Sequence, residues 1–392
     1  MKSGKWIAVT LAAAALLPLV IEASEGGRNY QLHNRLRFEY DDNIRDEDSG
    51  KTSSFKIIEE VEILYNINLE NTFLSLRYKP SFVWWENRED DETDLHHDLD
   101  FIFNHAFNPR LSLSIKDTLR FAELPEIAES GVITRRNSDY LFNSLNGILG
   151  YQVTPDGRLE LGSRYNLLRY DDDVIAEAED YNLYVAGLTY RYNLVPETAV
   201  TVDSRMETID YEGPIDRGSD NFQVGAGVEH MFSPNFLGNT RLGYQQKDYN
   251  DDELDSESEP FIDASLTFVP SPATRVTAGV GYSMFEADVF PYANQNRARM
   301  YVGAAHDITQ RISLNVVGSY INSDYEAVDA VDVEGVEARD GTEDIMQFST
   351  RATYRINRSN WVEAGWQFVT VDSDLRQNYD RNRFSVGWKT QL

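Results

Sequence analysis

The feature that most restricts the fold is a regular alternation of apolar and polar residues across positions 94–121. On both sides of the turn Asn108-Pro109-Arg110, large apolar side chains take most odd positions and polar or charged side chains take most even ones. A period of two residues around a proline turn predicts a β-hairpin. Each arm runs for about ten residues or more, roughly twice the length of an ordinary globular strand. Long strands with one apolar and one charged face are typical of a barrel wall that has lipid outside and water inside.

The same alternation continues along the chain from Tyr30 to Leu392, and short turns with Pro or Asn alternate with longer loops. We count about eighteen strands. A count of sixteen is also compatible with the sequence, because the alternation weakens within 159–209 and near 236–244. An even count places both ends of the mature chain in the periplasm. The predicted fold class is therefore all-β, a transmembrane antiparallel up-and-down β-barrel.

Residues 1–23 have the features of a secretory signal peptide, since Lys2 and Lys5 precede a short apolar run and a cleavage site at 21–23. The run is too short for a transmembrane helix, and no other segment reaches about 18 apolar residues. The chain has no cysteine, which excludes disulfides, a lipoprotein anchor and cysteine–zinc sites. Because no linker or change in composition divides the remainder, we predict a single barrel domain over residues 24–392.

The formal net charge of −29 is concentrated in four predicted loops, at residues 41–48, 86–94, 171–180 and 248–259. Acidic loops are usually solvated surface segments, and this sign of charge argues against nucleic-acid binding. Oxygen-rich clusters can also bind Ca²⁺, but the spacing matches no EF-hand or repeat motif. We therefore predict no cofactor, and note only weak calcium candidates at Asp171, Asp172, Asp173, Asp251 and Asp252.

Tyrosine and tryptophan at predicted strand ends suggest two interfacial girdles. These residues are Tyr40, Trp84, Trp85, Tyr140, Tyr170, Tyr249, Tyr320, Trp361 and Trp388. Three segments that lead into short turns each carry a histidine, and we expect His105, His230 and His306 to face outward at one rim. The last segment, 384–392, alternates to its apolar end, which is similar to the assembly signal of bacterial outer-membrane barrels except at Thr390 and Leu392.

Residues 37–44, Arg-Phe-Glu-Tyr-Asp-Asp-Asn-Ile, resemble the opening strand and first loop of the β-barrel porin type-2 family. The segment 132–137 and the turn at Thr154-Pro155 are also similar to that family. The resemblance implies a barrel in the outer membrane of a Gram-negative bacterium. Some members are encoded with exopolysaccharide synthesis and export systems, so the resemblance also admits polysaccharide export proteins as partners.

Inward positions follow from the alternation, and they predict a polar lumen of mixed charge, wide enough for water and solute. The predicted lumen-lining residues are Arg35, Arg37, Arg77, Lys79, Asp98, Asp100, Lys116, Arg120, Arg164, Arg205, Arg241, Arg275, Arg297, Arg299, Arg351 and Arg355. The many arginines favour anionic or sugar-like solutes, because rings of charge set selectivity. Alternatively, these charges mainly neutralise one another across a narrowed lumen.

An enzyme is not predicted, because no catalytic, phosphate-binding or zinc motif is present and no nucleophile accompanies the inward histidines His33 and His96. We predict an outer-membrane channel for small hydrophilic, anionic or sugar-like solutes. The alternatives are the barrel of an exopolysaccharide export system and a non-conducting structural or adhesive barrel. The expected partners are outer-membrane lipids, lipopolysaccharide and the barrel assembly machinery. The long loops at 122–137 and 326–343 are candidates for a constriction.

Overall fold

The structure, a computed structural model, describes residues 29–88, 92–122, 138–212, 218–250, 255–287, 292, 294–325 and 340–392. These residues form a sheet of 18 strands and a short helix, α2 (Asp173–Glu179). The strands are β1 (Tyr30–Asp41), β2 (Ser54–Asn68), β3 (Thr72–Trp85), β4 (Thr93–Asn108), β5 (Leu111–Ala122), β6 (Tyr140–Gln152), β7 (Gly157–Tyr170), β8 (Tyr181–Val195), β9 (Thr198–Tyr211), β10 (Ser219–Ser233), β11 (Phe236–Tyr249), β12 (Glu257–Ser271), β13 (Thr274–Glu286), β14 (Asn294–Asp307), β15 (Ile312–Tyr325), β16 (Gly341–Arg355), β17 (Asn360–Ser373) and β18 (Tyr379–Gln391).

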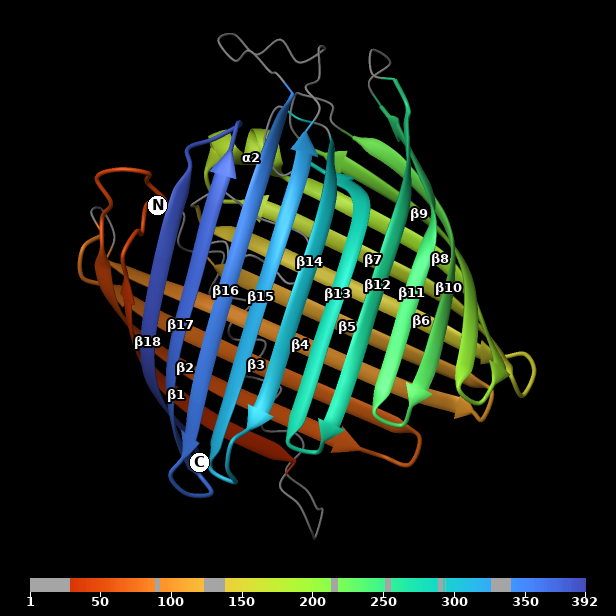
Figure 1. The fold of residues 1–392 in the computed structure, drawn as a ribbon, viewed down its shortest axis with the longest axis horizontal. Helices are drawn as coiled ribbons and strands as arrows, with labels where there is room; N and C mark the ends of the chain where they lie inside the picture. Colours follow the sequence, from red (N-terminus) through yellow and green to blue (C-terminus); the bar gives the residue numbers. More distant parts are fainter. Residues whose placement is uncertain are drawn as a thin grey trace.

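The sheet closes on itself, because each strand pairs antiparallel with its neighbours in the sequence and β1 pairs with β18. Figure 1 shows the result, a tilted wall with β10–β18 in front and β1–β9 behind. The predicted antiparallel β-barrel and its strand count are therefore confirmed. No helix among the described residues is long and apolar enough to cross a membrane. The predicted signal peptide at 1–23 lies outside the described residues.

Two rims follow from the connections between strands. Short turns join β2 to β3, β4 to β5 and so on at one end, here called the turn rim, and longer loops join the strands at the other end, the loop rim. At the first proline turn, the Asn108 side chain accepts hydrogen bonds from the amides of Arg110 and Leu111, at 2.9 and 3.0 Å. This side-chain turn explains why Asn precedes the proline. Strand β1 begins and β18 ends at the turn rim, where the amide of Leu392 donates to the carbonyl of Leu32.

The three histidines of the turn rim share one contact. His105, His230 and His306 each form a cross-strand hydrogen bond through Nδ1 to a threonine hydroxyl on the preceding strand, at 2.8, 2.9 and 2.9 Å. The threonines are Thr72, Thr198 and Thr274. Cross-strand pairs stabilise a sheet, so the repeated histidine marks a repeated structural pair of the turn rim.

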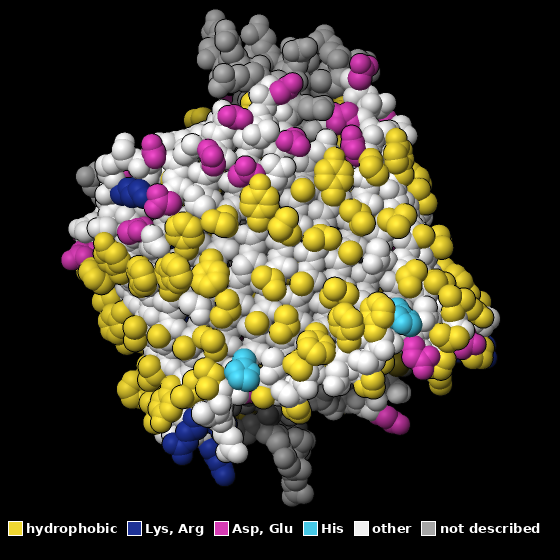
Figure 2. Space-filling view, viewed as in Figure 1, with side chains coloured by type: hydrophobic (Ala, Val, Ile, Leu, Met, Phe, Trp, Pro, Cys, Tyr) yellow, Lys and Arg dark blue, Asp and Glu magenta, His cyan; other side chains and the backbone are white. Residues whose placement is uncertain are grey.

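The outer face of the barrel is apolar at mid-height. Side chains such as Phe38, Leu242 and Val280 are half-exposed, which suits a wall that lies against lipid. Figure 2 shows hydrophobic side chains spread over the middle of one face, while acidic side chains gather toward the loop rim. The alternation in the sequence therefore reports the two faces of the wall directly.

The predicted aromatic girdles are only partly correct. Tyr40, Trp84, Tyr320 and Trp388 lie on outward positions. The other five residues lie on inward positions: Trp85, Tyr140, Tyr170, Tyr249 and Trp361. Most of these five occupy strand ends at the loop rim, where inward side chains pack against each other and against the loops instead of lipid. The prediction also began the last strand at Phe384, whereas β18 begins at Tyr379.

Candidate functional site: the charged lumen

The inner face of the wall is identified from the strand register, because residues opposite each other on neighbouring strands point to the same side. On β1, for example, Phe38 points outward, as does Val386 opposite it on β18. The residues on either side of Phe38, Arg37 and Glu39, point inward. By this rule the following predicted residues occupy inward positions: Arg35, Arg37, Arg77, Lys79, Asp98, Asp100, Lys116, Arg120, Arg164, Arg205, Arg241, Arg275, Arg297, Arg299, Arg351 and Arg355.

Strands β1–β4 carry a mixed-charge wall, defined here as Arg35, Glu60, Arg77, Lys79, Asp98 and Asp100. Arg35 binds Glu60 on β2 at 3.1 Å and Glu363 on β17 at 2.6 Å. Lys79 binds Glu60 at 3.4 Å and Asp98 at 3.0 Å. The Nε of Arg77 donates to Asp100 at 2.7 Å. Bases and acids thus alternate around the wall, so this sector neutralises itself along the sheet and not across the lumen.

A second paired sector lies on β7–β11. Arg164 binds Glu207 at 3.2 Å, and Arg241 donates to Asp203 at 2.9 Å. Nearer the turn rim, Arg191 makes a two-pronged contact with Glu229 at 2.8 and 3.0 Å. Such paired geometry holds arginine side chains in fixed positions against the wall.

Strands β13–β16 differ, because their inward positions carry five arginines and, among the described residues, only two carboxylates, Asp307 and Glu343, one toward each rim. This arginine wall consists of Arg275, Arg297, Arg299, Arg351 and Arg355. Arg275 and Arg351 share one cross-strand row, separated by Ala305 and Asn315. On the inward positions of β14 from 297 to 305, of β15 from 315 to 323 and of β16 from 347 to 355, the described wall has no carboxylate.

Small residues leave room in front of the arginine wall. The residues opposite Arg275, Arg297 and Arg299 on the facing strand are Ala305, Ser283 and Gly281. A hollow of about 420 Å³ opens beside this wall at the turn rim, and its lining residues include two bases, Arg275 and Arg351, and one acid, Asp307. Guanidinium groups in such a hollow can donate paired hydrogen bonds to the oxygens of a carboxylate or phosphate.

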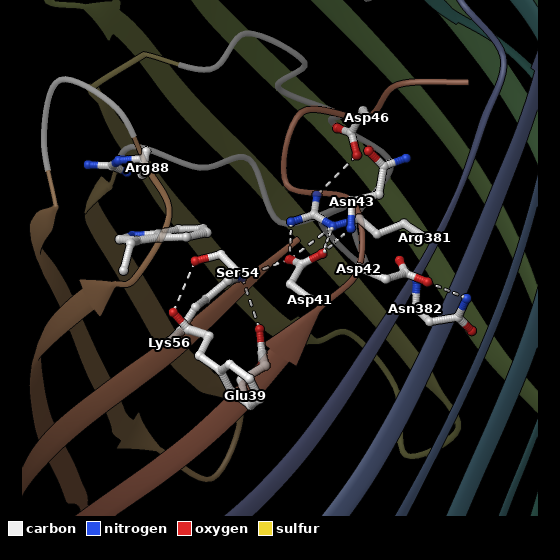
Figure 3. A network of polar contacts seen from close by, with 12 residues as sticks. Glu39, Asp41, Asp42, Asn43, Asp46, Ser54, Lys56, Arg88, Arg381 and Asn382 are labelled. Atoms are coloured by element: carbon white, nitrogen blue, oxygen red, sulfur yellow. Dashed lines mark hydrogen bonds and ion pairs between the residues drawn. The ribbon is translucent and has the colours of Figure 1, made fainter. Parts of the chain in front are cut away.

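The closing seam of the barrel is held at the loop rim by a buried network of charges, called here the outer-rim network: Glu39, Asp41, Lys56, Trp85 and Arg381. Figure 3 shows Arg381 of β18 reaching Asp41 of β1, and its Nε donates to that carboxylate at 2.9 Å. Lys56 of β2 binds Asp41 at 2.9 Å and Glu39 at 3.0 Å. The Lys56 ammonium also stands 4.2 Å from the centre of the Trp85 ring.

The first loop folds onto the inner face beside this network. Arg381 binds Asp46 of the loop at 3.1 Å. The side-chain amide of Asn43 donates to the backbone carbonyls of Glu47 and Asp380 at 2.7 and 3.0 Å. Ile44 packs against the inward residues of β2 and β3. The loop is therefore bound over the mouth of the barrel, and it narrows the lumen at the loop rim.

A second loop narrows the mouth through helix α2, which the sequence analysis did not predict. Asp172 caps the helix, accepting hydrogen bonds from the amides of Val174 and Ile175 at 2.9 and 3.1 Å. Ile175 and Ala176 then pack on a cluster of inward apolar residues. The cluster consists of Tyr140, Leu168, Tyr170, Tyr181, Leu183 and Ile209.

Asp180, the residue that follows α2, has a side chain that is buried from solvent. Asp180 accepts a hydrogen bond from the amide of Tyr170 at 2.8 Å. Burial raises the pKa of the Asp180 carboxyl, although that hydrogen bond and nearby Arg169 oppose the shift. The loop 171–180 is thus an ordered part of the mouth, and not only the solvated acidic segment that the sequence predicted.

Replacing Asp172 with alanine is expected to loosen α2, because it removes the acceptor for two helix amides. Loss of such a cap costs about 1 kcal/mol, which corresponds to roughly fivefold faster amide exchange in the first turn. Hydrogen exchange with mass spectrometry over residues 171–180 measures this change. The matched variant Asp171→Ala removes the same charge without the cap, and equal acceleration in both variants would contradict the capping role.

The sequence did not single out Lys56 and Arg381 of the outer-rim network as functional candidates. It also did not predict that Arg191 and Glu229 form an ion pair. Arg381 precedes Phe384, where the sequence-based strand began, so it was not assigned to a face. Lys56 occupies an inward position of β2 but was not singled out. A longer last strand would have placed Arg381 on the inner face. No periodicity could have shown that Lys56 and Arg381 meet Asp41.

The calcium candidates receive no support as a site. Among the described residues, no group of three or more His, Asp or Glu side chains is arranged to hold a metal ion. Asp172 is used as a helix cap, and Asp251 and Asp252 lie outside the described residues. The predicted constriction loops also lie largely outside the described residues.

Comparison with known proteins fits this geometry. A family model described as Putative beta-barrel porin 2 matches residues 127–392. The chain belongs to this family. As a β-barrel porin with this architecture, it resides in the bacterial outer membrane, as predicted. No curated protein matches the chain.

Solved structures show the same fold at low sequence identity. OccK1 (OpdK) of Pseudomonas aeruginosa is 10% identical, with a TM-score of 0.53 over 93% of this porin and 99% of OccK1. A crystal structure of OpdK with vanillate gives the same values. Another OpdK structure, described as an outer membrane protein of P. aeruginosa, gives 10% identity and a TM-score of 0.51 over 93% and 99% of the two chains. At this identity the likeness concerns the fold.

Proposed function

We propose that the barrel is a channel that favours small anionic solutes, including carboxylates and acidic sugars. The observation that carries this proposal is the contrast between the two walls. The mixed-charge wall pairs its bases with about as many acids, whereas the described inward positions of β13–β16 carry five arginines and two carboxylates, Asp307 and Glu343. This side of the lumen therefore carries an excess of basic side chains.

An unbalanced charge inside a low-dielectric wall raises the local concentration of counter-ions. Rings or rows of basic residues select for anions in this way, and guanidinium groups add directional binding of carboxylate and phosphate oxygens. The loops bound at the mouth restrict the size of solute that reaches the arginine wall. Small anions thus fit both the charge and the narrowing of the lumen. The OpdK structure with vanillate, an aromatic carboxylate, supplies a first solute to test.

The proposal is tested by recording currents of the refolded barrel in planar bilayers under a KCl gradient. A reversal potential on the side of chloride is expected, and added vanillate or a sugar acid is expected to reduce the chloride current. A reversal potential on the potassium side would contradict anion preference. A complete absence of current at high voltage would instead support a non-conducting barrel.

A further inference from the structure

The outer face of β1–β6 carries charged residues at apolar depth. Glu59 lies on an outward position of β2, opposite Leu36 and Phe82. Two apolar outward residues, Phe55 and Ile57, separate it from the loop rim. A carboxylate at this depth is expensive against hydrocarbon, because lipid offers it no hydrogen-bond donor.

A second carboxylate on the same face has the same setting. Asp117 lies on an outward position of β5, opposite Phe101 and Leu145. Leu119 and Phe121 separate it from the loop rim on the outward side. Both carboxylates are therefore within the apolar band and not at its edge.

Neutral side-chain amides donate hydrogen bonds to these carboxylates. Asn34 donates a hydrogen bond to Glu59, and Asn143 donates to Asp117 at 2.8 Å. A carboxylate has about four acceptor sites, so one amide compensates only part of the cost of leaving water. His97 lies between the two pairs on β4 and binds the Tyr78 hydroxyl through Nδ1 at 2.8 Å.

These five residues define the polar face: Asn34, Glu59, His97, Asp117 and Asn143. The rest of the described wall is different. The outward carboxylates Asp220, Asp248 and Asp344 have no apolar outward residue between them and the loop rim. Figure 2, which looks onto the wall of β10–β18, shows no acidic side chain in the middle of that face.

The polar face also coincides with an interruption in the sheet. The paired residues of β2 and β3 run to Glu60 opposite Ser81 and resume only at Ile63 opposite Tyr78. Between them lies Pro80, which has no N–H to donate and lies opposite His97 on the outward side. The pairing of the sheet is thus interrupted where its outer surface carries the polar face.

We propose that the polar face is the contact surface of a two-fold dimer of this chain. Hydrocarbon supplies no donors, and the acidic groups of lipopolysaccharide would repel Glu59 and Asp117. A second copy brings the imidazole of its own His97 and the amides of its Asn34 and Asn143 to these acceptors. A surface that holds both donors and acceptors is self-complementary, which is the requirement of a two-fold interface. Polar contacts of this kind hold membrane segments together.

Cross-linking in outer membranes tests the surface, because the chain has no native cysteine. Phe82→Cys and Leu99→Cys place single thiols on the outward side of β3 and β4, and Val280→Cys and Val302→Cys place matched thiols on the opposite wall. Under mild oxidation, a dimer band is expected for at least one variant of the first pair and for neither of the second. No dimer from the first pair, or equal dimer from both pairs, would overturn the proposal.

The mass of the detergent-solubilised barrel gives an independent test. The wild-type chain is expected to sediment as a dimer, and Glu59→Leu with Asp117→Leu is expected to weaken dimerisation by about tenfold or more. The control Ser204→Leu with Thr240→Leu removes outward polar groups from β9 and β11 and is expected to leave the dimer intact. A monomeric wild type, or a dimer unaffected by the leucines at 59 and 117, would show that the polar face contacts lipid. Either result leaves the solute preference of the lumen untouched.

Discussion

Replacing Arg275 and Arg351 together with glutamate is expected to convert the channel from anion to cation preference. Both side chains belong to one inward row of the arginine wall, where Ala305 and Asn315 provide no opposing charge. In a water-filled lumen, each unit charge about 8 Å from the ion contributes roughly 0.5 kcal/mol. Reversing both arginines changes the energy of each ion by about 2 kcal/mol, with opposite sign for chloride and potassium, so the unscreened limit is on the order of a thousandfold in the permeability ratio. Screening by salt reduces this effect, and a change of about tenfold or more is expected at low salt.

Reversal potentials in a KCl gradient measure this effect for the variant and the wild type. The matched control is Arg110→Glu with Arg358→Glu, which makes the same change of charge in two exposed turns of the turn rim. The control is expected to retain anion preference. Equal shifts in the two double variants would mean that overall charge, and not the arginine wall, sets the selectivity.

Replacing Asp41 with alanine is expected to cause the largest loss of stability among single substitutions in the described barrel wall. Asp41 is fully buried, and its removal leaves both Lys56 and Arg381 without their shared partner. Removing one member of a buried ion pair costs about 3–5 kcal/mol. Lys56 keeps Glu39 and Arg381 keeps Asp46, so we expect a loss at the lower end of this range, about 3 kcal/mol. Urea unfolding in detergent micelles, followed by tryptophan fluorescence, measures the free energy of unfolding.

The control for this prediction is Glu229→Ala, which removes a carboxylate from the half-exposed pair with Arg191. Both side chains of that pair are more than a third exposed, at 38% and 36%. Exposed pairs contribute about 0–1 kcal/mol. A loss at Asp41 no larger than the loss at Glu229 would contradict a sealing role for the outer-rim network.

Much of the wall could be predicted because lipid and water impose a period of two on every strand. Phe101 and Asp100 are neighbours in the sequence and yet face opposite sides, and that difference is visible in the residue types alone. The same rule fails beyond the apolar band. Trp85 and Tyr140 resemble girdle residues, but near the loop rim the inner face packs against loops, so their aromatic character does not reveal their direction.

The sequence predicts which face of the wall a charged side chain occupies better than it predicts the partner of that side chain in an ion pair. Arg35 was placed on the inner face, but its contact with Glu363 depends on closure of the first strand against the last two. The alternation says nothing of this stagger between strands. Helix α2 was missed for a related reason, since seven residues among acids give no clear helical period, and the helix is held by the apolar cluster below it.

The outer-rim network also has a consequence for the order of events during insertion. Asp41 and Arg381 are 340 positions apart, so their contact cannot form until β18 has reached β1. Until then, Asp41 and Lys56 stand at an open edge where water can reach them. The sheet therefore closes and these charged groups lose contact with water in the same step. The first loop, which is bound to Arg381 through Asp46, takes its place over the mouth only when the last strand arrives.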